Sequence, residues 1–271
     1  MKTRLVIPVL AAACVSLLGC DRVPTDARNP GGPSFITHGS LDDAHPAVGL
    51  IVMDIAGVPA FRCSGTLISS TVVLTAGHCA GEPGEFSGLR FFAEADVTRA
   101  ADPTYPGPGG PNTHEAIEWH SHPAFTEALF FLHDVGVVVL GTPVDLPADQ
   151  YGRLPAANSL DALHPGNKTT FTSVGYGVQR INPSHLESVR IRMFAEPRLI
   201  NFVGDFSLLL SNNASTGGTC FGDSGGPNYL GSSSVIAGVT SFARNGNCAG
   251  TGGVFRLDRQ NVLDFVGQFL R

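Results

Sequence analysis

The chain has 271 residues, of which 43% are hydrophobic and 15% are charged, and this globular composition provides enough apolar surface for a sizeable core. The net charge of −6 gives no basic footprint for nucleic acid, which excludes DNA- and RNA-binding classes. The 33 glycines and 19 prolines predict many turns. Because long helical periodicity is scarce as well, an all-β class is favoured.

Residues 1–19 have the pattern of an export signal. A short basic start, Met1–Arg4, precedes the almost wholly apolar run Leu5–Leu18, which is too short to span a bilayer comfortably. The alternative is a membrane anchor that is never cleaved. We expect residues 1–19 to be removed on export.

The end of this signal, Leu17–Cys20, resembles a bacterial lipobox, although Leu18 is bulkier than is usual at its position. In that interpretation Cys20 becomes a lipidated first residue that holds the protein at a membrane without a spanning helix. The alternative is ordinary signal cleavage. We expect a monomeric lipoprotein of the cell envelope, periplasmic or at the surface, or a protein secreted after release. Residues 20–35 are rich in Pro and Gly and are expected to form a flexible tether.

From Ala47 onward, short strand-like runs alternate with turn signals. A Pro-rich segment, 142–158, separates two β-rich halves, and the Pro/Gly-rich segment 100–113 is expected to be a surface loop. The strands predicted in the first half are 47–54, 61–68, 71–75, 89–95, 115–120 and 135–140. Those predicted in the second half are 169–176, 188–194, 206–210, 234–242 and 253–257.

Only the end of the chain, Arg259–Leu270, has a helical stripe, formed by Val262, Phe265, Val266 and Phe269. Two β-rich halves and one terminal helix predict two packed antiparallel barrels. The predicted domain covers residues 36–271, with an N-terminal barrel, a C-terminal barrel and a helix over 36–147, 148–258 and 259–270.

Two of the six cysteines, Cys14 and Cys20, belong to the leader. An even number remains, which in an exported chain indicates disulfides. These four allow three pairings, and the local pairing closes the shorter loops, each bond stabilising the fold by roughly 3 kcal/mol. A zinc site is the competing interpretation, which the lack of a C-x-x-C pair disfavours. We expect no metal and no cofactor. The four cysteines are Cys63, Cys79, Cys220 and Cys248.

The first candidate catalytic segment is Thr219–Pro227. Its serine, Ser224, is flanked by glycines, so its hydroxyl can lie exposed on a tight turn that a substrate backbone approaches closely. The N–H groups of Gly222 and Ser224 could converge on an oxyanion. The alternative is an ordinary Gly/Ser loop.

The second segment, Leu74–Cys79, ends an apolar run with small residues and His78. A serine hydroxyl is a poor nucleophile at neutral pH and needs a base such as histidine, whose pKa lies near the working pH. The alternative is a structural or exposed histidine, since the chain has nine.

The third segment begins at Asp134, which directly precedes the apolar run 135–140. A carboxylate at the edge of the core needs a partner, and a histidine ring N–H would suit it. The alternative is an aspartate that accepts hydrogen bonds from backbone N–H groups at the strand entry. The neighbouring His133 is expected on the opposite face of the strand.

Together these segments resemble the chymotrypsin-like serine peptidases of the trypsin superfamily. The matching motifs are LTAGHC at 74–79, DVGVVVL at 134–140 and GDSGGP at 222–227, in the family's His, Asp, Ser order. The similarity runs from about Ile36 to the C-terminus, with further matches at 61–68, 175–177, 238–242 and 253–255. It implies two six-stranded β-barrels with the site in the cleft between them, and the disulfides Cys63–Cys79 and Cys220–Cys248.

The resemblance also implies a mechanism. His78 takes the proton of Ser224 as that residue attacks the carbonyl of a protein or peptide substrate, and Asp134 orients His78. The N–H groups of Gly222 and Ser224 hold the oxyanion, and water then releases an acyl-enzyme. The expected activity is that of a serine endopeptidase.

By the same resemblance, Gly218 is the floor of the substrate pocket, next to Thr219, and Ser241, Phe242, Ala243 and Gly253 are its walls. None of these residues is charged, which predicts cleavage after an uncharged residue, small aliphatic or medium apolar.

Members of the family commonly mature by cleavage that frees an amine. Here the expected new N-terminus is Ile36, whose amine would pair with Asp223 after cleavage of the Phe35–Ile36 bond. The match to the N-terminal sequence that is usual in mature members of the family is partial, because Thr37 and His38 differ from it. The alternative is a site that is formed constitutively with the tether intact.

Two other classes compete with a serine peptidase. The first is a catalytically inactive relative that keeps the fold as a binding module on the cell envelope. The second is an α/β-hydrolase esterase, which the chain order of the three residues disfavours. The sequons at Asn167 and Asn213 are not expected to be glycosylated in the bacterial setting that a lipobox implies.

Overall fold

The computed structural model describes residues 36–98, 112–182 and 185–270. The predicted leader, Cys20, the tether and most of the predicted loop 100–113 lie outside these residues. Within the described ranges, no helix combines the length and the apolar character that a membrane crossing requires.

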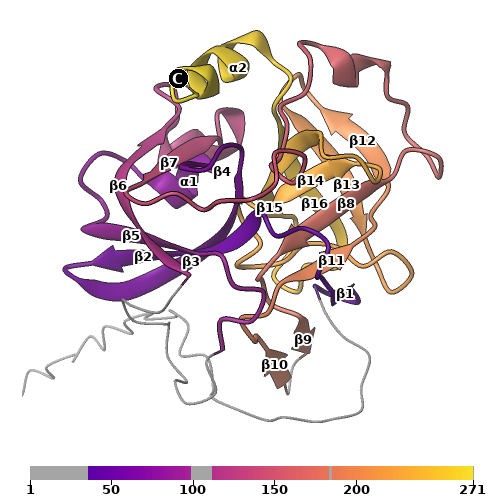
Figure 1. The fold of residues 1–271 in the computed structure, drawn as a ribbon. Coiled ribbons are helices and arrows are strands. Elements are labelled where there is room, and N and C mark those ends of the chain that lie inside the picture. The colour runs from indigo at the N-terminus through magenta and orange to yellow at the C-terminus, as the bar shows by residue number, and fades with distance from the viewer. Residues whose placement is uncertain (1–35, 99–111, 183–184, 271) are drawn as a thin grey trace, which may run out of the picture.

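The first half of the chain forms a closed barrel of antiparallel strands in the order β2-β3-β4-β7-β6-β5 (Figure 1). Each strand predicted in the first half of the sequence becomes one of the strands of this barrel. Successive side chains of a strand point to opposite faces, so alternating or wholly apolar sequences can fill the barrel interior. The strands are β2 (Val48–Ile55), β3 (Val58–Leu67), β4 (Val72–Thr75), β5 (Gly88–Phe92), β6 (Thr113–Ser121) and β7 (Gly136–Leu140).

The second half forms a curled sheet with the strand order β1-β11-β8-β14-β15-β16-β13-β12. A separate two-stranded ribbon, β9 (Arg180–Asn182) and β10 (His185–Glu187), extends from it. The strands of the sheet are β1 (Ser40–Leu41), β8 (Phe171–Gly175), β11 (Met193–Ala195), β12 (Leu199–Val203), β13 (Ser207–Asn212), β14 (Pro227–Leu230), β15 (Ile236–Ala243) and β16 (Gly250–Arg256).

Both ends of the described chain cross between the two halves. At the start, β1 pairs with β11 of the sheet, although it precedes the barrel in sequence. At the end, the chain returns to the barrel as α2 (Gln260–Gly267), where Phe265 and Phe269 contact His122 and His120 at ring-centroid distances of 5.3 and 5.1 Å (Figure 1). The two halves are therefore tied together by both termini.

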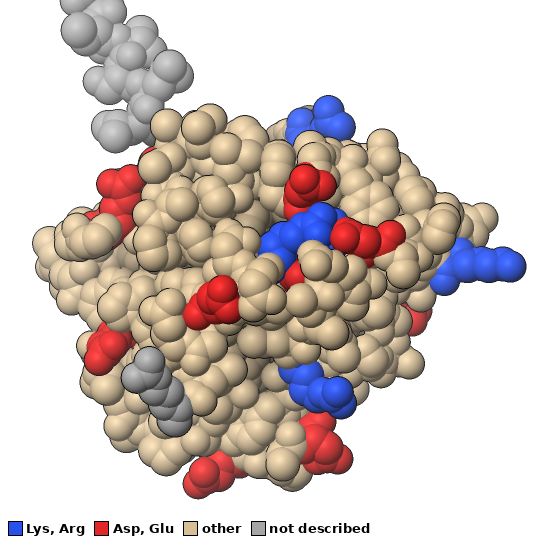
Figure 2. Space-filling view, turned by 90° about the horizontal axis from the view of Figure 1, so that it is seen from above, with Lys and Arg blue, Asp and Glu red and all other residues tan. Residues whose placement is uncertain are grey.

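Three short helices complete the fold: α1 (Gly77–Ala80) and the 3₁₀ helices η1 (Glu127–Leu132) and η2 (Ser159–Ala162). The largest core cluster draws on both halves and on α2, with Leu74 of the barrel, Ile236 of the sheet and Val266 of the helix all fully buried. Charged side chains are few and scattered on the face seen from the α2 side (Figure 2).

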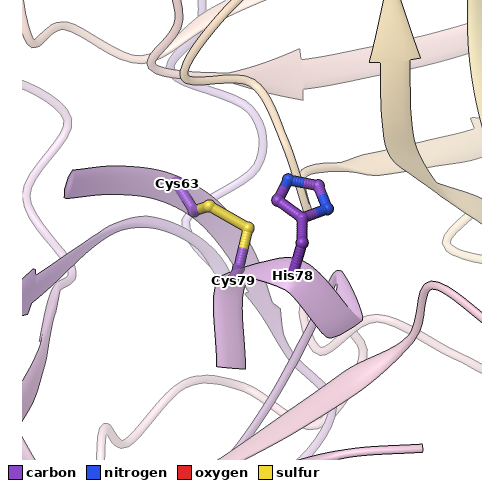
Figure 3. A group of neighbouring side chains, drawn as sticks. All are labelled: Cys63, His78 and Cys79. Atoms are coloured by element: carbon purple, nitrogen blue, oxygen red, sulfur yellow. A yellow bond between two sulfur atoms is a disulfide. The ribbon is translucent and has the colours of Figure 1, made fainter. Parts of the chain in front are cut away.

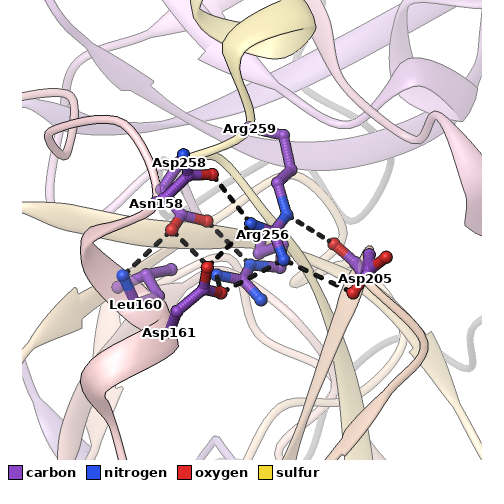
Figure 4. A network of polar contacts seen from close by, with 7 residues as sticks. All are labelled: Asn158, Leu160, Asp161, Asp205, Arg256, Asp258 and Arg259. Atoms are coloured by element: carbon purple, nitrogen blue, oxygen red, sulfur yellow. Dashed lines mark hydrogen bonds and ion pairs between the residues drawn. The ribbon is translucent and has the colours of Figure 1, made fainter.

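A buried ion-pair network joins the sheet to η2 (Figure 4). The guanidinium of Arg256, at the end of β16, donates to Asp258 over 2.7 and 2.8 Å and to Asp161 over 2.7 Å. Asp258 also accepts the N–H of Leu160 over 2.9 Å. Because Arg256 and Asp258 are almost completely buried, each requires the other's charge.

The predicted fold class is confirmed: the structure is nearly all-β, with a closed six-stranded barrel, a curled sheet and a C-terminal helix. The second half differs in detail from a six-stranded barrel, because its sheet has eight strands, one of them β1. The strands without a sequence prediction are β1, β9, β10, β12 and β14, of two to five residues each. Segments this short show too little alternation to stand out.

Candidate active site

A cleft of about 350 Å³ lies between the barrel and the sheet. The barrel contributes His78, Glu127 and Phe130 to its lining. The sheet side contributes Thr219, Cys220, Phe221, Ser224, Thr240, Ser241, Phe242 and Ala243. The predicted base and the predicted nucleophile, 146 residues apart in the chain by their numbers, thus line one cavity.

His78 and Asp134 meet because β4 and β7 are paired neighbours. His78 lies on α1 just after β4, and Asp134 lies just before β7. The ring Nδ1 of His78 is 3.0 Å from each carboxylate oxygen of Asp134, and the backbone N–H of His78 donates to Oδ1 over 3.0 Å. Asp134 is completely buried, whereas a quarter of the His78 side chain is exposed to the cleft.

A further group completes the surroundings of this carboxylate. The hydroxyl of Ser241, on β15, donates to Oδ2 of Asp134 over 2.5 Å. Hydrogen bonds to the ionised form favour it, so the buried charge is supported from both the barrel and the sheet. Sequence reasoning placed Ser241 in the pocket wall and missed this contact, for which no local pattern gives a signal.

The environment of His78 favours its protonated form. Burial by itself lowers the pKa of His78, but the charge and hydrogen bond of Asp134 and the charges of Glu127 and Glu85 outweigh it, so the net pKa is raised. A base of this kind gains affinity for the proton that it must accept.

Ser224 lies on a tight turn before β14. The turn is closed by hydrogen bonds from the N–H of Asp223 to Cys220 O (3.0 Å) and from the N–H of Gly226 to Asp223 O (2.8 Å). Gly225 has φ +77°, and a Cβ at this position would lie 2.0 Å from Oγ1 of Thr75. Glycine is therefore required for the turn to pack against the barrel.

The N–H groups of Gly222 and Ser224 are available at the same turn. Within the described ranges, neither donates to a protein acceptor. Gly222 has φ +93°, and its carbonyl is held by the hydroxyl of Ser64 over 3.0 Å. The Ser224 carbonyl accepts the N–H of Ser64 over 2.7 Å, so Ser64 fixes this turn on both sides.

Four of the predicted pocket residues line the cleft: Thr219, Ser241, Phe242 and Ala243. Gly253 is instead covered by the ring of Phe242, since a Cβ on Gly253 would lie 2.3 Å from that ring. Its neighbour Gly252 is the glycine that approaches Thr219, at 3.1 Å from the Cβ position to Oγ1.

Gly218, the predicted floor, does not itself line the cleft. A Cβ on Gly218 would lie 2.4 Å from the side chain of Asn212, which occupies the space behind it. The buried amide of Asn212 accepts a hydrogen bond from Thr37 over 2.7 Å and donates to the carbonyl of Thr219 over 2.8 Å. The group behind Gly218 is thus a neutral amide whose oxygen and nitrogen both take part in hydrogen bonds.

The two residues predicted for activation are both buried. Asp223 accepts the N–H groups of Gly177 and Cys220, each over 2.8 Å. Burial raises the pKa of Asp223 to about 7, although these hydrogen bonds and the charge of Arg62 act in the opposite direction. Ile36 packs in a small apolar cluster with Met193 and Ala195.

Disulfides join Cys63 to Cys79 and Cys220 to Cys248, with Cα–Cα distances of 6.1 and 5.4 Å. The first bond lies beside His78 (Figure 3). Ligand-type atoms of Cys63, His78 and Cys79 come within 4.8 Å of one another, but both sulfurs are bonded and supply no thiolate for a metal. The bonds support the local pairing and are consistent with an exported protein.

Four lining residues were not predicted as site residues. Phe221 and Thr240 lie inside segments that the motifs covered, whereas Glu127 and Phe130 lie outside them. Glu127 and Phe130 both lie on η1, in the segment that leads to Asp134. The segment Glu127–Leu132 has no regular spacing of apolar residues, and only its nearness to Asp134 in the sequence could have drawn attention to it.

The two-part fold and the cleft with its His, Asp and Ser define the class of chymotrypsin-like serine peptidases. The family model described as Trypsin matches residues 45–265. The chain therefore belongs to the trypsin family, and it is a serine endopeptidase.

Among curated proteins, the chain is 29% identical over 199 residues to a brachyurin from Leptuca pugilator, covering 69% of this chain and 78% of the relative. It is 29% identical over 189 residues to a chymase from Canis lupus familiaris, covering 68% of this chain and 69% of the relative. Among solved structures, HL collagenase (TM-score 0.64) and human heparin binding protein (TM-score 0.63) are each 20% identical. They cover 86% of this chain and 97% and 95% of their own chains, and this likeness supports the fold alone.

Proposed function

We propose that the protein hydrolyses peptide bonds through an acyl-enzyme on Ser224, with His78 as general base and then general acid, and Asp134 as the group that orients His78. The N–H groups of Gly222 and Ser224 bind the oxyanion of the tetrahedral intermediate. The proton of the Ser224 hydroxyl passes to His78 and then to the leaving amine, and water hydrolyses the ester.

One observation carries the proposal: Nδ1 of His78 is held by Asp134 in the cleft that Ser224 also lines. A hydrogen bond at Nδ1 fixes the ring tautomer and leaves Nε2 as the proton acceptor. The unengaged N–H groups of Gly222 and Ser224 at the same turn support the oxyanion role.

A fluorophosphonate probe tests the nucleophile directly. We expect it to label the protein covalently at Ser224, and we expect Ser224→Ala to lose both labelling and peptide hydrolysis. Ser233→Ala, at an exposed serine, serves as the matched control and should keep both. Labelling that survives in Ser224→Ala would contradict the assignment.

We propose further that the residue on the acyl side of the cleaved bond is uncharged. The sheet side of the cleft has no charged side chain, and the amide of Asn212 behind Gly218 would not compensate a buried ammonium or carboxylate. Profiling on a peptide library should give cleavage after small aliphatic or medium apolar residues. Efficient cleavage after Arg, with none after Ala, Val, Leu or Phe, would refute this preference.

For activation, we propose that cleavage of the Phe35–Ile36 bond frees an ammonium that pairs with Asp223 and orders the oxyanion hole. The raised pKa of Asp223 supports this, because a buried carboxylate with that pKa gains from a cation. Ile36 is buried, and the hydroxyl of the next residue, Thr37, donates to the carbonyl of Gly218 over 3.0 Å. Active protein whose N-terminus lies well upstream of Ile36 would instead support a constitutive site.

We also propose export through the signal 1–19 and a lipid anchor at Cys20, with the peptidase domain monomeric at the cell envelope. The Leu17–Cys20 sequence supports the anchor. Labelling of cells with an alkyne fatty acid should mark the protein and should fail in Cys20→Ala. Unchanged labelling in that variant, or a secreted wild-type form without lipid, would favour ordinary signal cleavage. Size-exclusion chromatography tests the monomer.

The second candidate is a catalytically inactive binding module. The fold is similar to that of human heparin binding protein, which is named for binding and not for catalysis. The intact set of His78, Asp134 and Ser224 argues against it. The fluorophosphonate experiment separates the two candidates, since an inactive module would not be labelled.

A further inference from the structure

The two walls of the cleft differ in charge. The sheet wall, from Thr219 to Ser224 and from Thr240 to Ala243, has only uncharged lining residues. The barrel wall has Glu127 and Phe130 beside His78, and Glu127 is the one acidic residue that lines the cleft. Nothing in the catalytic steps proposed above uses Glu127 or Phe130.

The ring of Phe130 bridges the cleft between its two walls. Its centroid lies 6.2 Å from that of His78 and 6.4 Å from that of Phe242, with both ring pairs nearly perpendicular. A third ring, that of Phe131, lies 5.8 Å from Phe130. Phe130 nevertheless lines the cleft and is only partly buried, so part of its ring is open to a substrate. An aromatic face of this kind takes an aliphatic stem or a cation.

Glu127 is an exposed residue at the border of the cleft, and its carboxylate is partly buried. Partial burial has the largest effect and raises the pKa of Glu127. The like charge of Glu85 raises this pKa further, while the charge of His78 lowers it. Across the described residues, no basic side chain forms an ion pair with Glu127. A cation brought into the cleft would stabilise the ionised form.

An extended substrate connects these two features to the reaction. If it adds as a strand alongside β15 at Ser241 and Ala243, its successive side chains point to opposite faces. The residue whose carbonyl is attacked then directs its side chain into the uncharged sheet wall. The residue before it directs its side chain toward the barrel wall, where Phe130 and Glu127 lie.

We propose that Phe130 and Glu127 form a subsite for a lysine or arginine side chain at the substrate residue that precedes the attacked one. The stem packs on the Phe130 ring and the cationic head faces the Glu127 carboxylate. This assignment rests on the proposed peptidase function, and it gives the enzyme a two-residue preference: a cation followed by an uncharged residue.

Matched peptides test the subsite. They share one uncharged residue at the cleaved bond and differ only in the residue before it, which is Lys, Gln or Glu. We expect kcat/KM for Lys to exceed that for Gln by about fivefold at low salt, the combined size of a partly exposed ion pair and a cation–π contact. The preference should shrink in high salt, because screening weakens charge pairs.

Variants then identify the residue responsible. Glu127→Gln should reduce the Lys/Gln ratio to about twofold, the part left to the Phe130 contact, and Glu127→Lys should favour the Glu peptide. Glu118→Gln, at an exposed glutamate of β6 outside the cleft lining, is the matched control and should keep the wild-type ratio. Ratios between peptides cancel any effect of Glu127 on His78. A wild-type ratio near one, or a ratio in Glu127→Gln as large as that of wild type, would overturn the subsite.

Binding separates this inference from the proposed catalysis. The affinities of the same three peptides for Ser224→Ala, measured by fluorescence anisotropy, should follow the order Lys, Gln, Glu. If wild-type protein hydrolyses none of the peptides, the peptidase proposal fails, whereas the charge order in binding still decides the subsite. Equal affinities of Ser224→Ala for the Lys and Glu peptides would refute it.

Discussion

Asp134 and Asp223 are both completely buried near the cleft, one at the end of the barrel and one in the turn on the sheet side. Asp134 accepts hydrogen bonds from the ring and backbone of His78 and from Ser241, so a titratable partner and a hydroxyl surround it. Asp223 has two backbone N–H groups as donors, and burial raises its pKa to about 7.

This difference shows which buried carboxylate accepts hydrogen bonds from backbone N–H groups alone, without a cationic or titratable donor. Asp258, a third buried acid, has the guanidinium of Arg256 as a permanent counter-ion (Figure 4). Asp134 has a histidine that becomes cationic in the proposed reaction. Asp223 has the nearby charge of Arg62, which does not offset its desolvation. The acid next to the nucleophile is therefore the one that a newly freed ammonium would stabilise most.

The largest expected effect is that of Asp134→Asn. An amide in this position selects the wrong tautomer of His78, so kcat should fall about 10⁴-fold while the protein stays folded. Steady-state kinetics on a peptide substrate and thermal unfolding of the same sample check both parts. A loss of less than tenfold would show that His78 needs no orienting carboxylate here.

Arg256→Met comes next, and it acts on stability. It leaves the carboxylate of Asp258 buried without its counter-ion, so the free energy of unfolding should fall by about 3–5 kcal/mol. Urea unfolding measures the change, with the exposed Arg153→Met as the control. If the loss is below 1 kcal/mol, water rather than Arg256 compensates Asp258.

Asp223→Asn should act in a pH-dependent way on protein that has not been cleaved before Ile36. A raised folded-state pKa means that the folded protein loses stability as the pH rises from near 4, the unfolded value, through about 7. The asparagine variant has no titrating group at this position, so at pH 8 it should be more stable than wild type by about 4 kcal/mol, the equivalent of about three pKa units. At pH 4 the two should be equal. A wild-type stability that does not fall over this range would contradict the prediction.

The smallest expected effect is that of Glu127→Gln on the pH dependence of activity. His78 must be neutral to act as base, and its raised pKa places the acid limb of kcat/KM above the usual histidine value of about 6.5. Since the charge of Glu127 contributes to that rise, the variant's limb should move to lower pH by a fraction of a unit. A limb that moves to higher pH would show that Glu127 acts on His78 other than through its charge.

The sequence by itself determined the barrel strands, the stripe of α2 and the family. It also supplied the prediction that His78, Asp134 and Ser224 are the catalytic residues. Long apolar runs and the motifs around these residues are local signals, and the strands of the barrel are long enough for their pattern to register. The disulfide partners followed from the family resemblance.

The tertiary structure alone decided what surrounds these residues. The hydroxyl of Ser241 on Asp134, the amide of Asn212 behind Gly218 and the ring of Phe242 over Gly253 all join segments that are distant in the chain or on neighbouring strands. The acidic barrel wall at Glu127 has the same origin, because η1 lies in the cleft only when the barrel has closed. Such contacts depend on how packed elements meet, which local spacing does not encode.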